Sequence, residues 1–490
     1  MHARKTSTWF AFALTPGLIL AGCSHAPRPA VPPIAITHVS VIDATGSAVQ
    51  RDMTVLLDGE TIAAIGSFAT TKIPEYSTVI DATGKFLIPG LVDAHLHLTG
   101  SKEPNGSRKF MLPLLIANGV TTVRDMGGYM ESLKPLRDDI KHGKRIGPQI
   151  FFAGPYLDGS PPSFQPSLVV TNATQASEDV HTLVQQGVDF IKVQSVLNRD
   201  AYFAIAAAAK REHISFVGHV PDRVTAFEAS DAGQRSIEHL TGVLRSCASD
   251  EPRLIREQTQ PTPKYSTPSG SHSREVAWER ELAATQSDRN TARLIATFVR
   301  NRTWHTPTLI LLREDAFPTA EARSATEDTL KYIPASIAQN WESAARKQDE
   351  FATQAEFALR EKLLARSMQV VKQMQVAGVP IMAGTDSAAP YVVPGFALHE
   401  ELGLMVRAGL TPMQALQSAT KNPADFLGKL DSQGTIEKGK GADFVLLDAD
   451  PLDDIGNIEK IRAIFLRGKL LDRQMLDEML SSAETYAVAN

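Results

Sequence analysis

Two histidines, His95 and His97, follow the apolar run 86–91 after a short connection. In an extended chain, residues i and i+2 point to the same side, so both imidazoles can bind one ion together. An isolated His-x-His pair is more commonly a pair of hydrogen-bonded surface side chains. The pair therefore indicates a metal site only when other ligands occur at matching positions.

A lysine, Lys192, lies within the otherwise apolar run 190–193. Burial of an ammonium group is costly, so we expect this amine to be neutral or chemically altered. Reaction with carbon dioxide would convert it into a carbamate, which is a carboxylate on a long arm that can bridge two cations. The alternative is a lysine whose amine reaches solvent at the end of its strand while its methylene groups stay buried.

Three more candidate ligands end short apolar runs later in the chain: His219, His239 and Asp386. Barrel enzymes keep their chemistry at the carboxyl ends of the strands, where these residues are expected. Taken singly, each histidine would more commonly be a core residue with one hydrogen bond. Asp386 follows a strand end of small residues and could both bind a metal and transfer protons.

Residues 85–426 alternate short apolar runs with longer helical patterns, which is typical of βα units and a parallel sheet. We predict an α/β fold, a (β/α)8 TIM barrel, because eight such units close naturally into a barrel. An open doubly wound sheet is the alternative, but no Gly-rich phosphate loop follows the first strand. The expected strands are 86–91, 121–124, 149–153, 190–193, 215–218, 236–238, 304–309 and 379–384.

Strand-like segments return at both ends of the chain. Residues 34–84 and 427–480 contain short β-branched runs broken by turn residues, and we expect them to form one small β-sandwich domain. Two long connections, 244–302 and 334–375, are expected to act as lids at the functional face. For 244–302 a disordered surface is an equally good interpretation, because 258–273 is rich in Pro, Ser and Thr.

The composition is that of an ordinary globular protein. The chain has 490 residues, 43% of them hydrophobic and 21% charged, with a formal net charge of -5. Its length allows one large domain or two moderate ones. Because the charge is slightly acidic and no basic stretch stands out, a nucleic acid is not expected as a partner.

The N-terminus resembles a bacterial export signal. Residues 1–22 have a short basic start and an apolar run too short to span a bilayer comfortably, and they end in Leu-Ala-Gly before Cys23. This pattern resembles a lipobox, so we expect lipidation at Cys23, a Pro- and Ala-rich tether at 23–33, and a lipid anchor in the membrane. Ser24 favours the periplasmic face of the outer membrane, or the cell surface. The alternatives are an ordinary signal-peptidase site or an uncleaved anchor.

The remaining cysteine, Cys247, would then have no intramolecular partner, so no structural disulfide is expected. An exported protein of this kind must be stabilised by the size of its core. A homo-oligomer is compatible with the sequence.

Taken together, these motifs resemble the amidohydrolase superfamily. The Pro-Gly-Leu-Val-Asp-Ala-His-Leu-His stretch at 89–97, the lysine of the fourth strand, the two later strand-end histidines and the Gly-Thr-Asp stretch at 384–386 carry the resemblance. More narrowly, the chain is similar to the imidazolonepropionase-like branch, which includes Xaa-Pro and Xaa-Arg dipeptidases and ochratoxin amidases. The similarity extends from about residue 34 to 473.

The resemblance implies a ligand set by matching motif position. His95, His97 and Asp386 would hold a buried divalent metal, His219 and His239 would hold an outer one, and carbamylated Lys192 and a hydroxide would bridge the two. Imidazole and carboxylate ligands without thiolate suit Zn²⁺. Imidazolonepropionase works with one metal, and the lysine is the feature that favours two here. Glu238, Arg124 and Asp125 are interpreted as supporting residues.

The implied activity is hydrolysis of a C–N bond in a small amide-like substrate, with Asp386 as general acid and base. Tyr156, His305, His399 and Arg124 are weak candidates for substrate contacts, since each is as readily explained by packing. A mononuclear deaminase or cyclic-amide hydrolase on the same barrel is one alternative, which leaves Lys192 without a role. A non-catalytic solute-binding lipoprotein is another.

Overall fold

The computed structural model describes residues 32–98, 106–260, 268–317, 326–350, 352–387 and 389–490. The predicted signal peptide, the lipidation site Cys23 and most of the predicted tether lie outside these ranges. Across the described ranges, none of the helices combines the length and the apolar character needed to cross a membrane.

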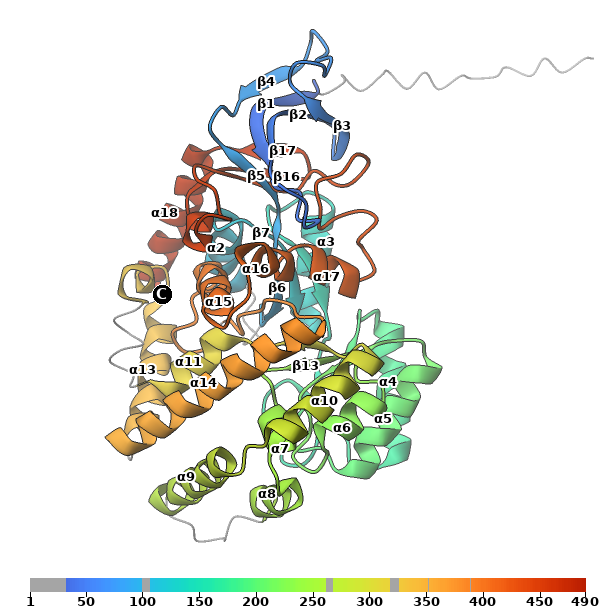
Figure 1. Ribbon diagram of the computed structural model, residues 1–490, viewed down its shortest axis with the longest axis vertical. Helices are drawn as coiled ribbons and strands as arrows, with labels where there is room; N and C mark the ends of the chain where they lie inside the picture. The colour runs from blue at the N-terminus through green and yellow to red at the C-terminus, as the bar shows by residue number, and fades with distance from the viewer. Residues whose placement is uncertain (1–31, 99–105, 261–267, 318–325, 351, 388) are drawn as a thin grey trace, which may run out of the picture.

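One sheet joins both ends of the chain, as Figure 1 shows by the meeting of blue and red strands. Its order is β17-β16-β15-β5-β1-β2-β3, with β4 paired to β1. Alternating buried side chains such as Val55, Leu87 and Phe465 form its own small core. The strands form a single eight-stranded sheet, so a separate β-sandwich is not confirmed. The strands are β1 Ile34–Val41, β2 Gln50–Asp58, β3 Thr61–Ser67, β4 Thr78–Asp81, β5 Phe86–Pro89, β15 Phe444–Leu447, β16 Ile461–Leu466 and β17 Lys469–Leu471.

The central part contains two parallel sheets, ordered β6-β7-β8 and β10-β9-β11-β12-β13-β14. Most of these strands are short and wholly buried, as expected for a parallel sheet covered by helices. The strands are β6 Leu91–Leu96, β7 Val120–Asp125, β8 Gln149–Phe152, β9 Tyr156–Asp158, β10 Ser167–Val169, β11 Ile191–Val193, β12 Phe216–Gly218, β13 Ser236–Glu238 and β14 Trp304–Thr306.

Two of the predicted strands were wrong in detail. The expected first strand divides at Gly90, so that β5 belongs to the terminal sheet and β6 begins the central part. The expected eighth strand, 379–384, makes only an isolated bridge between Ile381 and His305. Pro380, which precedes Ile381, has no N–H to donate, and this limits the hydrogen-bond ladder there.

The segment 380–387 nevertheless connects the two parallel sheets. The N–H of His305 donates to the carbonyl of Pro380 (3.0 Å), and the N–H of Ala94 donates to the carbonyl of Ala383 (3.0 Å). On the other side, the N–H of Asp189 donates to the carbonyl of Phe152 (2.9 Å). The N–H of Met382 donates to the carbonyl of His305, and the N–H groups of Thr385 and Asp386 donate to the carbonyl of His95. Several backbone hydrogen bonds therefore link the sheets at their edges, without forming one closed ladder.

Helices alternate with the central strands and cover them (Figure 1). Side-chain caps begin several of them, including Asn172 at α4 and Asn198 at α5. The helical elements up to residue 231 are η1 Ser107–Met111, α2 Leu112–Ala117, α3 Met130–Lys141, α4 Ala173–Gln186, α5 Arg199–Arg211 and α6 Ala226–Asp231.

Both long connections are largely helical where they are described, although residues 261–267 lie outside the described ranges. They contribute α8, α9 and α10 in the first and α13 and α14 in the second, and α14 packs against α9, α10 and α11. The bounds are α7 Val243–Cys247, α8 Glu251–Gln258, α9 Pro268–Ala284, α10 Asp288–Asn301, α11 Leu309–Ala316, α13 Ala335–Asp349 and α14 Gln354–Ala377. Helix α11 begins where the seventh strand was expected to end.

The last part of the chain returns to the central helices before it ends. Helix α18 packs against α2 and η1, and the rings of Phe110 and Tyr486 stack with centroids 6.4 Å apart. The predicted domain boundary at residue 480 therefore falls inside this helix. The remaining elements are α15 Phe396–Arg407, α16 Pro412–Ser418, α17 Lys421–Phe426, η2 Ile455–Glu459 and α18 Arg473–Ala489.

Candidate metal centre

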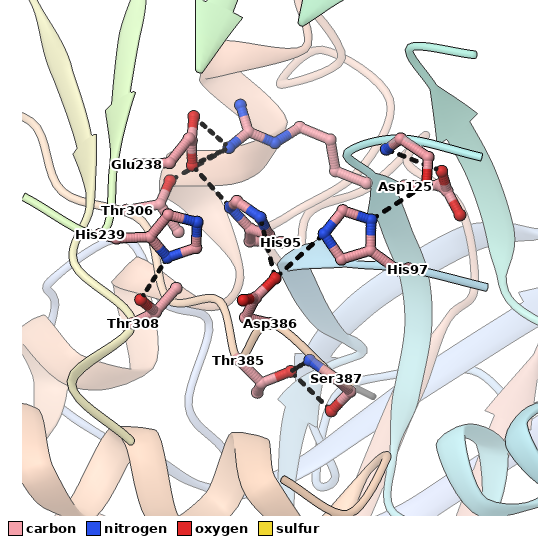
Figure 2. Close-up of polar contacts among 12 residues, drawn as sticks. His95, His97, Asp125, Glu238, His239, Thr306, Thr308, Thr385, Asp386 and Ser387 are labelled. Atoms are coloured by element: carbon pink, nitrogen blue, oxygen red, sulfur yellow. Dashed lines mark hydrogen bonds and ion pairs between the residues drawn. The ribbon is translucent and has the colours of Figure 1, made fainter. Parts of the chain in front are cut away.

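Three predicted ligands meet at the carboxyl end of β6 (Figure 2). His95 lies on β6, His97 follows it, and Asp386 follows the bridging segment. The Nε2 atoms of His95 and His97 lie 3.2 and 3.0 Å from Asp386 Oδ1. The ligand atoms of all three residues lie within 4.8 Å of one another. This spacing fits three ligands around a single ion.

The approach of Asp386 to His95 depends on a glycine. A Cβ atom at Gly384 would lie 2.6 Å from the Thr306 side chain and 2.7 Å from the backbone nitrogen of His95. Asp386 itself has a positive φ of 65°. Left-handed conformations of residues other than glycine are unfavourable and cluster at functional sites.

His219 and His239 lie beside this group. The ring centroids of His95 and His239 are 4.3 Å apart, and those of His219 and His239 are 5.0 Å apart. His239 has a φ of 56°. Gly218 precedes His219 with a φ of 128°, and a Cβ there would collide with the carbonyl oxygen of Val193. The backbone at both strand ends is thus shaped to present an imidazole.

All four histidines are engaged at Nδ1, which leaves Nε2 for an ion. His95 Nδ1 donates to Glu238 (3.0 Å), and His97 Nδ1 donates to the carbonyl of Gly127 (3.0 Å). His219 Nδ1 is bonded to the Ser195 hydroxyl at 2.8 Å. Such partners fix the tautomer and the ring orientation of metal-binding histidines.

The partner of His239 defines its tautomer. Thr308 Oγ1 donates its hydrogen to the carbonyl of Pro307 (2.8 Å), so it accepts one from His239 Nδ1 (2.8 Å). Burial lowers the pKa of His219 and of His239 well below the usual value, and the nearby Lys192 lowers both further. Both rings are therefore neutral at pH 7 and keep a lone pair on Nε2.

The buried ion pair of Arg124 and Glu238 holds His95 in place through its Nδ1 atom. Arg124 Nη2 donates to both carboxylate oxygens of Glu238 (3.0 and 2.8 Å), and it also contacts Thr306 Oγ1 (3.1 Å). Burial raises the pKa of Glu238, but Arg124 and His95 outweigh it and hold that pKa well below its usual range. The glutamate is thus an anion that accepts a hydrogen bond from His95, which agrees with its predicted supporting role.

Lys192 lies on β11 with its side chain almost fully buried. Among the described residues, its Nζ atom has no hydrogen-bond partner. Burial lowers the pKa of the Lys192 amine to about 8, while Glu238 and Asp386 raise it and Arg124 lowers it. A sizeable fraction of the amine is therefore neutral near pH 7.5, as a reaction with carbon dioxide requires.

The residues present fit a divalent metal. His95 Nε2 and Asp386 Oδ1 are buried, and within the described part of the chain neither makes a hydrogen bond of acceptable geometry. Buried polar atoms without partners are rare in proteins unless an ion or water satisfies them. Imidazole nitrogens with a carboxylate oxygen form a donor set that suits Zn²⁺.

A cavity of about 760 Å³ opens in front of these ligands, which we call the metal cavity. His97, Lys192, His219, His239 and Asp386 line it, together with apolar and aromatic side chains that include Phe110, Phe164, Leu312 and Trp341. A mostly apolar cavity with a few convergent polar groups is typical of a small-molecule site.

Of the four predicted substrate contacts, Tyr156 lines the metal cavity, where its hydroxyl lies 3.1 Å from His97 Nδ1. The other three do not line it. Arg124 is occupied by Glu238, His399 donates from Nε2 to the carbonyl of Asn118 (2.9 Å), and buried His305 packs against Phe298. In the structure, these three side chains therefore contact other protein groups and do not face the metal cavity.

Other residues of the metal cavity were missed from the sequence. Asp315 and Trp341 lie on α11 and α13, and Gln194 follows β11. Gln194 could have been identified, because it is two residues beyond Lys192 and so on the same side of an extended chain. The helical residues give no such signal, because their contact with the cavity depends on how the helices pack.

Comparison with known proteins gives short local matches. A 129-residue segment is 36% identical to adenine deaminase 1 of Desulfotalea psychrophila, covering 26% of this chain and 20% of the relative. A 69-residue segment is 44% identical to dihydroorotase of Bacillus licheniformis, and a 90-residue segment is 36% identical to ochratoxinase of Aspergillus niger. These segments cover 14% and 18% of this chain and of the respective relative, so the chain spans a fifth or less of the length of each of the three.

Solved structures match over nearly the whole chain. Bottromycin amidohydrolase superimposes with a TM-score of 0.69 at 22% identity, covering 94% of this chain and 91% of that one. A Xaa-Pro dipeptidase with bound methionine superimposes with a TM-score of 0.63 at 20% identity, covering 90% and 100%. At these identities the likeness concerns the fold, and it implies that the central α/β part is a TIM barrel.

The metal-binding geometry and this fold agree with a match to the amidohydrolase family over residues 86–471. Because the match spans most of the chain, the protein belongs to the amidohydrolase family.

Proposed function

We propose that this protein is a metal-dependent hydrolase that cleaves the C–N bond of a small amide-like substrate in the metal cavity. The observation that carries the proposal is a set of four imidazoles, each engaged at Nδ1. Three of them line the metal cavity with Asp386 and Lys192, and the fourth, His95, is buried against Asp386. Support also comes from the relatives, whose names describe hydrolases of C–N bonds such as dihydroorotase.

The ligand assignment follows from the residues. His95, His97 and Asp386 would hold one divalent ion, and His219 and His239 a second. The neutral amine of Lys192 would attack carbon dioxide, form an N–C bond and release a proton, and the resulting carbamate would be the shared ligand. When bound, divalent zinc would act as a Lewis acid and lower the pKa of a water molecule towards neutrality.

The chain's own groups account for the proton transfers. The carboxylate of Asp386 accepts a proton from the attacking water and returns it to the departing amine nitrogen, the work of a general acid and base. Tyr156, beside His97 in the metal cavity, is suited to donate its hydroxyl hydrogen to the substrate carbonyl oxygen. Burial raises the pKa of Tyr156 well above its usual value, so this hydroxyl keeps its hydrogen.

The first experiment joins elemental analysis of the purified protein to a screen of dipeptides, N-acyl amino acids and cyclic amides. About two metals per chain with amide cleavage is the expected result. One metal per chain, with ammonia released from an amine substrate, would instead indicate a mononuclear deaminase. A third outcome is that the protein binds no metal even after Zn²⁺ is added and cleaves none of the substrates. This outcome would indicate a solute-binding protein and overturn the proposal.

We also propose that the protein is exported and anchored to the membrane by a lipid at Cys23. The support is the sequence of the first 23 residues alone. Labelling of expressing bacteria with a radioactive fatty acid should mark the wild-type chain, and a Cys23→Ala variant should be unlabelled and soluble after export. Equal labelling of both chains would contradict the anchor.

A further inference from the structure

A second cavity lies next to the metal cavity. It has a volume of about 880 Å³ and is bounded by α9, α11, α13 and α14. Leu312 and Asp315, both on α11, line this cavity and the metal cavity alike. A smaller cavity of about 330 Å³ shares Leu312 with both. Helix α11 is therefore a common wall, and we call the second cavity the distal chamber.

The two long connections build the distal chamber, and none of the proposed metal ligands lies on them. Glu275 and Glu279 come from α9, Lys347 from α13 and Arg360 from α14. In Figure 1 these helices lie on the side of the molecule away from the terminal sheet. Both connections thus contribute to a space that adjoins the reacting centre.

One side chain of the distal chamber has an unsatisfied donor. Arg360 is nine-tenths buried, and its Nε atom donates to Glu279 Oε1 at 3.2 Å. Its Nη1 atom is also buried and has no hydrogen-bond partner within the described ranges. A buried guanidinium N–H without an acceptor is unfavourable, so a ligand that brings an oxygen acceptor would be bound there.

The charges of the distal chamber limit what this ligand can be. Four carboxylates and two cations line it: Glu275, Glu279, Asp315, Glu350, Lys347 and Arg360. A further anion would be repelled by this excess of negative charge, whereas a cation would be attracted. The acceptor for Arg360 is thus a neutral oxygen on a molecule that is cationic elsewhere.

We propose that the distal chamber is a subsite for substrates that extend past α11 and carry a positively charged group. Arg360 Nη1 donates to a neutral carbonyl oxygen of the substrate, and Asp315 and Glu275 accept hydrogen bonds from its ammonium group. The inference rests on the proposed amide hydrolysis and narrows its substrates to extended, basic amides such as lysine-containing peptides.

The test compares two capped peptides of equal length, acetyl-Ala-Ala-lysine amide and acetyl-Ala-Ala-norleucine amide, on the metal-loaded full chain. We expect KM for the lysine peptide to be about tenfold lower, the effect of one charged hydrogen bond. Asp315→Asn should abolish this preference. Glu361→Gln removes the same charge from the exposed face of α14 and should leave the preference unchanged.

A second variant separates the two contacts. Arg360→Lys keeps the charge but shortens the donor, so it should raise KM for both peptides several-fold and keep the lysine preference. Equal KM values in the wild-type protein, or a preference that survives Asp315→Asn, would overturn the proposal. If neither peptide is cleaved, the binding of both peptides to the same protein is measured by calorimetry. Selective binding of the lysine peptide would support the subsite and contradict amide hydrolysis. Equal binding, or none, would reject the subsite.

Discussion

The residues of the metal centre are held by partners that leave one atom of each free. The carboxylate of Glu238, the carbonyl of Gly127 and the hydroxyl of Thr308 accept from Nδ1 of three histidines. Lys192 differs, because its amine is buried without a hydrogen-bond partner among the described residues. Because these side chains have one chemically available atom each, single substitutions should have separable effects.

Asp386→Asn should reduce kcat by roughly 10²- to 10⁴-fold, because the amide cannot accept the proton of the attacking water. Metal content should be measured on the same sample, since the variant also replaces a ligand. Near-normal turnover with both metals retained would show that another group moves the proton.

Lys192→Ala should lose most of the activity and part of the bound metal, since the proposed bridging carboxylate is absent. Added formate, acetate or propionate should restore part of both, because a free carboxylate can occupy the space of the removed side chain. Metal content measured beside turnover separates rescue of the site from a general salt effect. If no acid rescues a properly folded variant, the carbamate has no support.

Helix α11 extends from the proposed metal centre along both cavities, and a residue of another helix binds its N-terminus. Thr308, with a φ of 47°, precedes α11 and accepts from His239, while Asp315 near the end of the helix faces the cavities. The side chain of Thr308 does not cap the helix. Instead, buried Glu401 of α15 accepts from the backbone N–H of Ile310 at 2.8 Å. A carboxyl group at this end of a helix satisfies a donor that has no partner inside the helix.

Stability should depend on pH through Glu401. Burial raises the pKa of Glu401 from 4.5 to about 8, against the opposing backbone N–H groups of Leu309 and Ile310. The folded protein therefore keeps a proton that the unfolded chain releases between these values. The contribution of protonated Glu401 to the free energy of unfolding is fully present below about pH 4.5 and is lost as the pH rises towards 8. The free energy of unfolding falls by at most about 1.4 kcal/mol per pH unit in this range.

The measurement is the free energy of unfolding against pH for the wild-type protein and Glu401→Gln, which cannot ionise. The variant should gain stability relative to the wild-type protein as the pH rises from 5 to 8. Glu361→Gln, on the exposed face of α14, should show no such trend. A pH-independent difference for Glu401→Gln would mean that the carboxyl group is already ionised at low pH.

In the whole molecule, the proposed metal ligands come from segments that are far apart in the sequence. His97 follows β6, His219 follows β12, His239 follows β13 and Asp386 follows the bridging segment 380–387. The two central sheets meet at this segment without a continuous ladder. An ion bound by these residues would therefore link strand ends of both central sheets directly, in addition to the backbone hydrogen bonds of the segment 380–387.

Removal of metal by a chelator should lower Tm. A ligand present at a hundred times its Kd stabilises the folded state by about 2.7 kcal/mol, which for a chain of this size is roughly 2–3 °C. Addition of Zn²⁺ should restore the original Tm, and Mg²⁺, which prefers oxygen ligands, should not. An unchanged Tm, after elemental analysis has shown that the metal is gone, would contradict this role.

The sequence alone determined the parts that depend on neighbours along the chain. His95 and His97 could be paired because alternation in a strand is a local property. Lys192 could be identified as a candidate because burial of an ammonium group in an apolar run is unfavourable. The structure brings these residues together with His219, His239 and Asp386. Family membership was predicted from the same motifs and is confirmed.

Only the tertiary structure decided how distant segments meet. Arg124 and Glu238 are 114 residues apart and neutralise each other, which removed Arg124 from the substrate contacts. The expected eighth strand became a bridge because Pro380 lacks a donor, and the expected sandwich is one sheet because β5 and β15 pair directly. Asp315 and Trp341 reach the metal cavity through helix packing, which depends on side chains far apart in the sequence and leaves no local pattern.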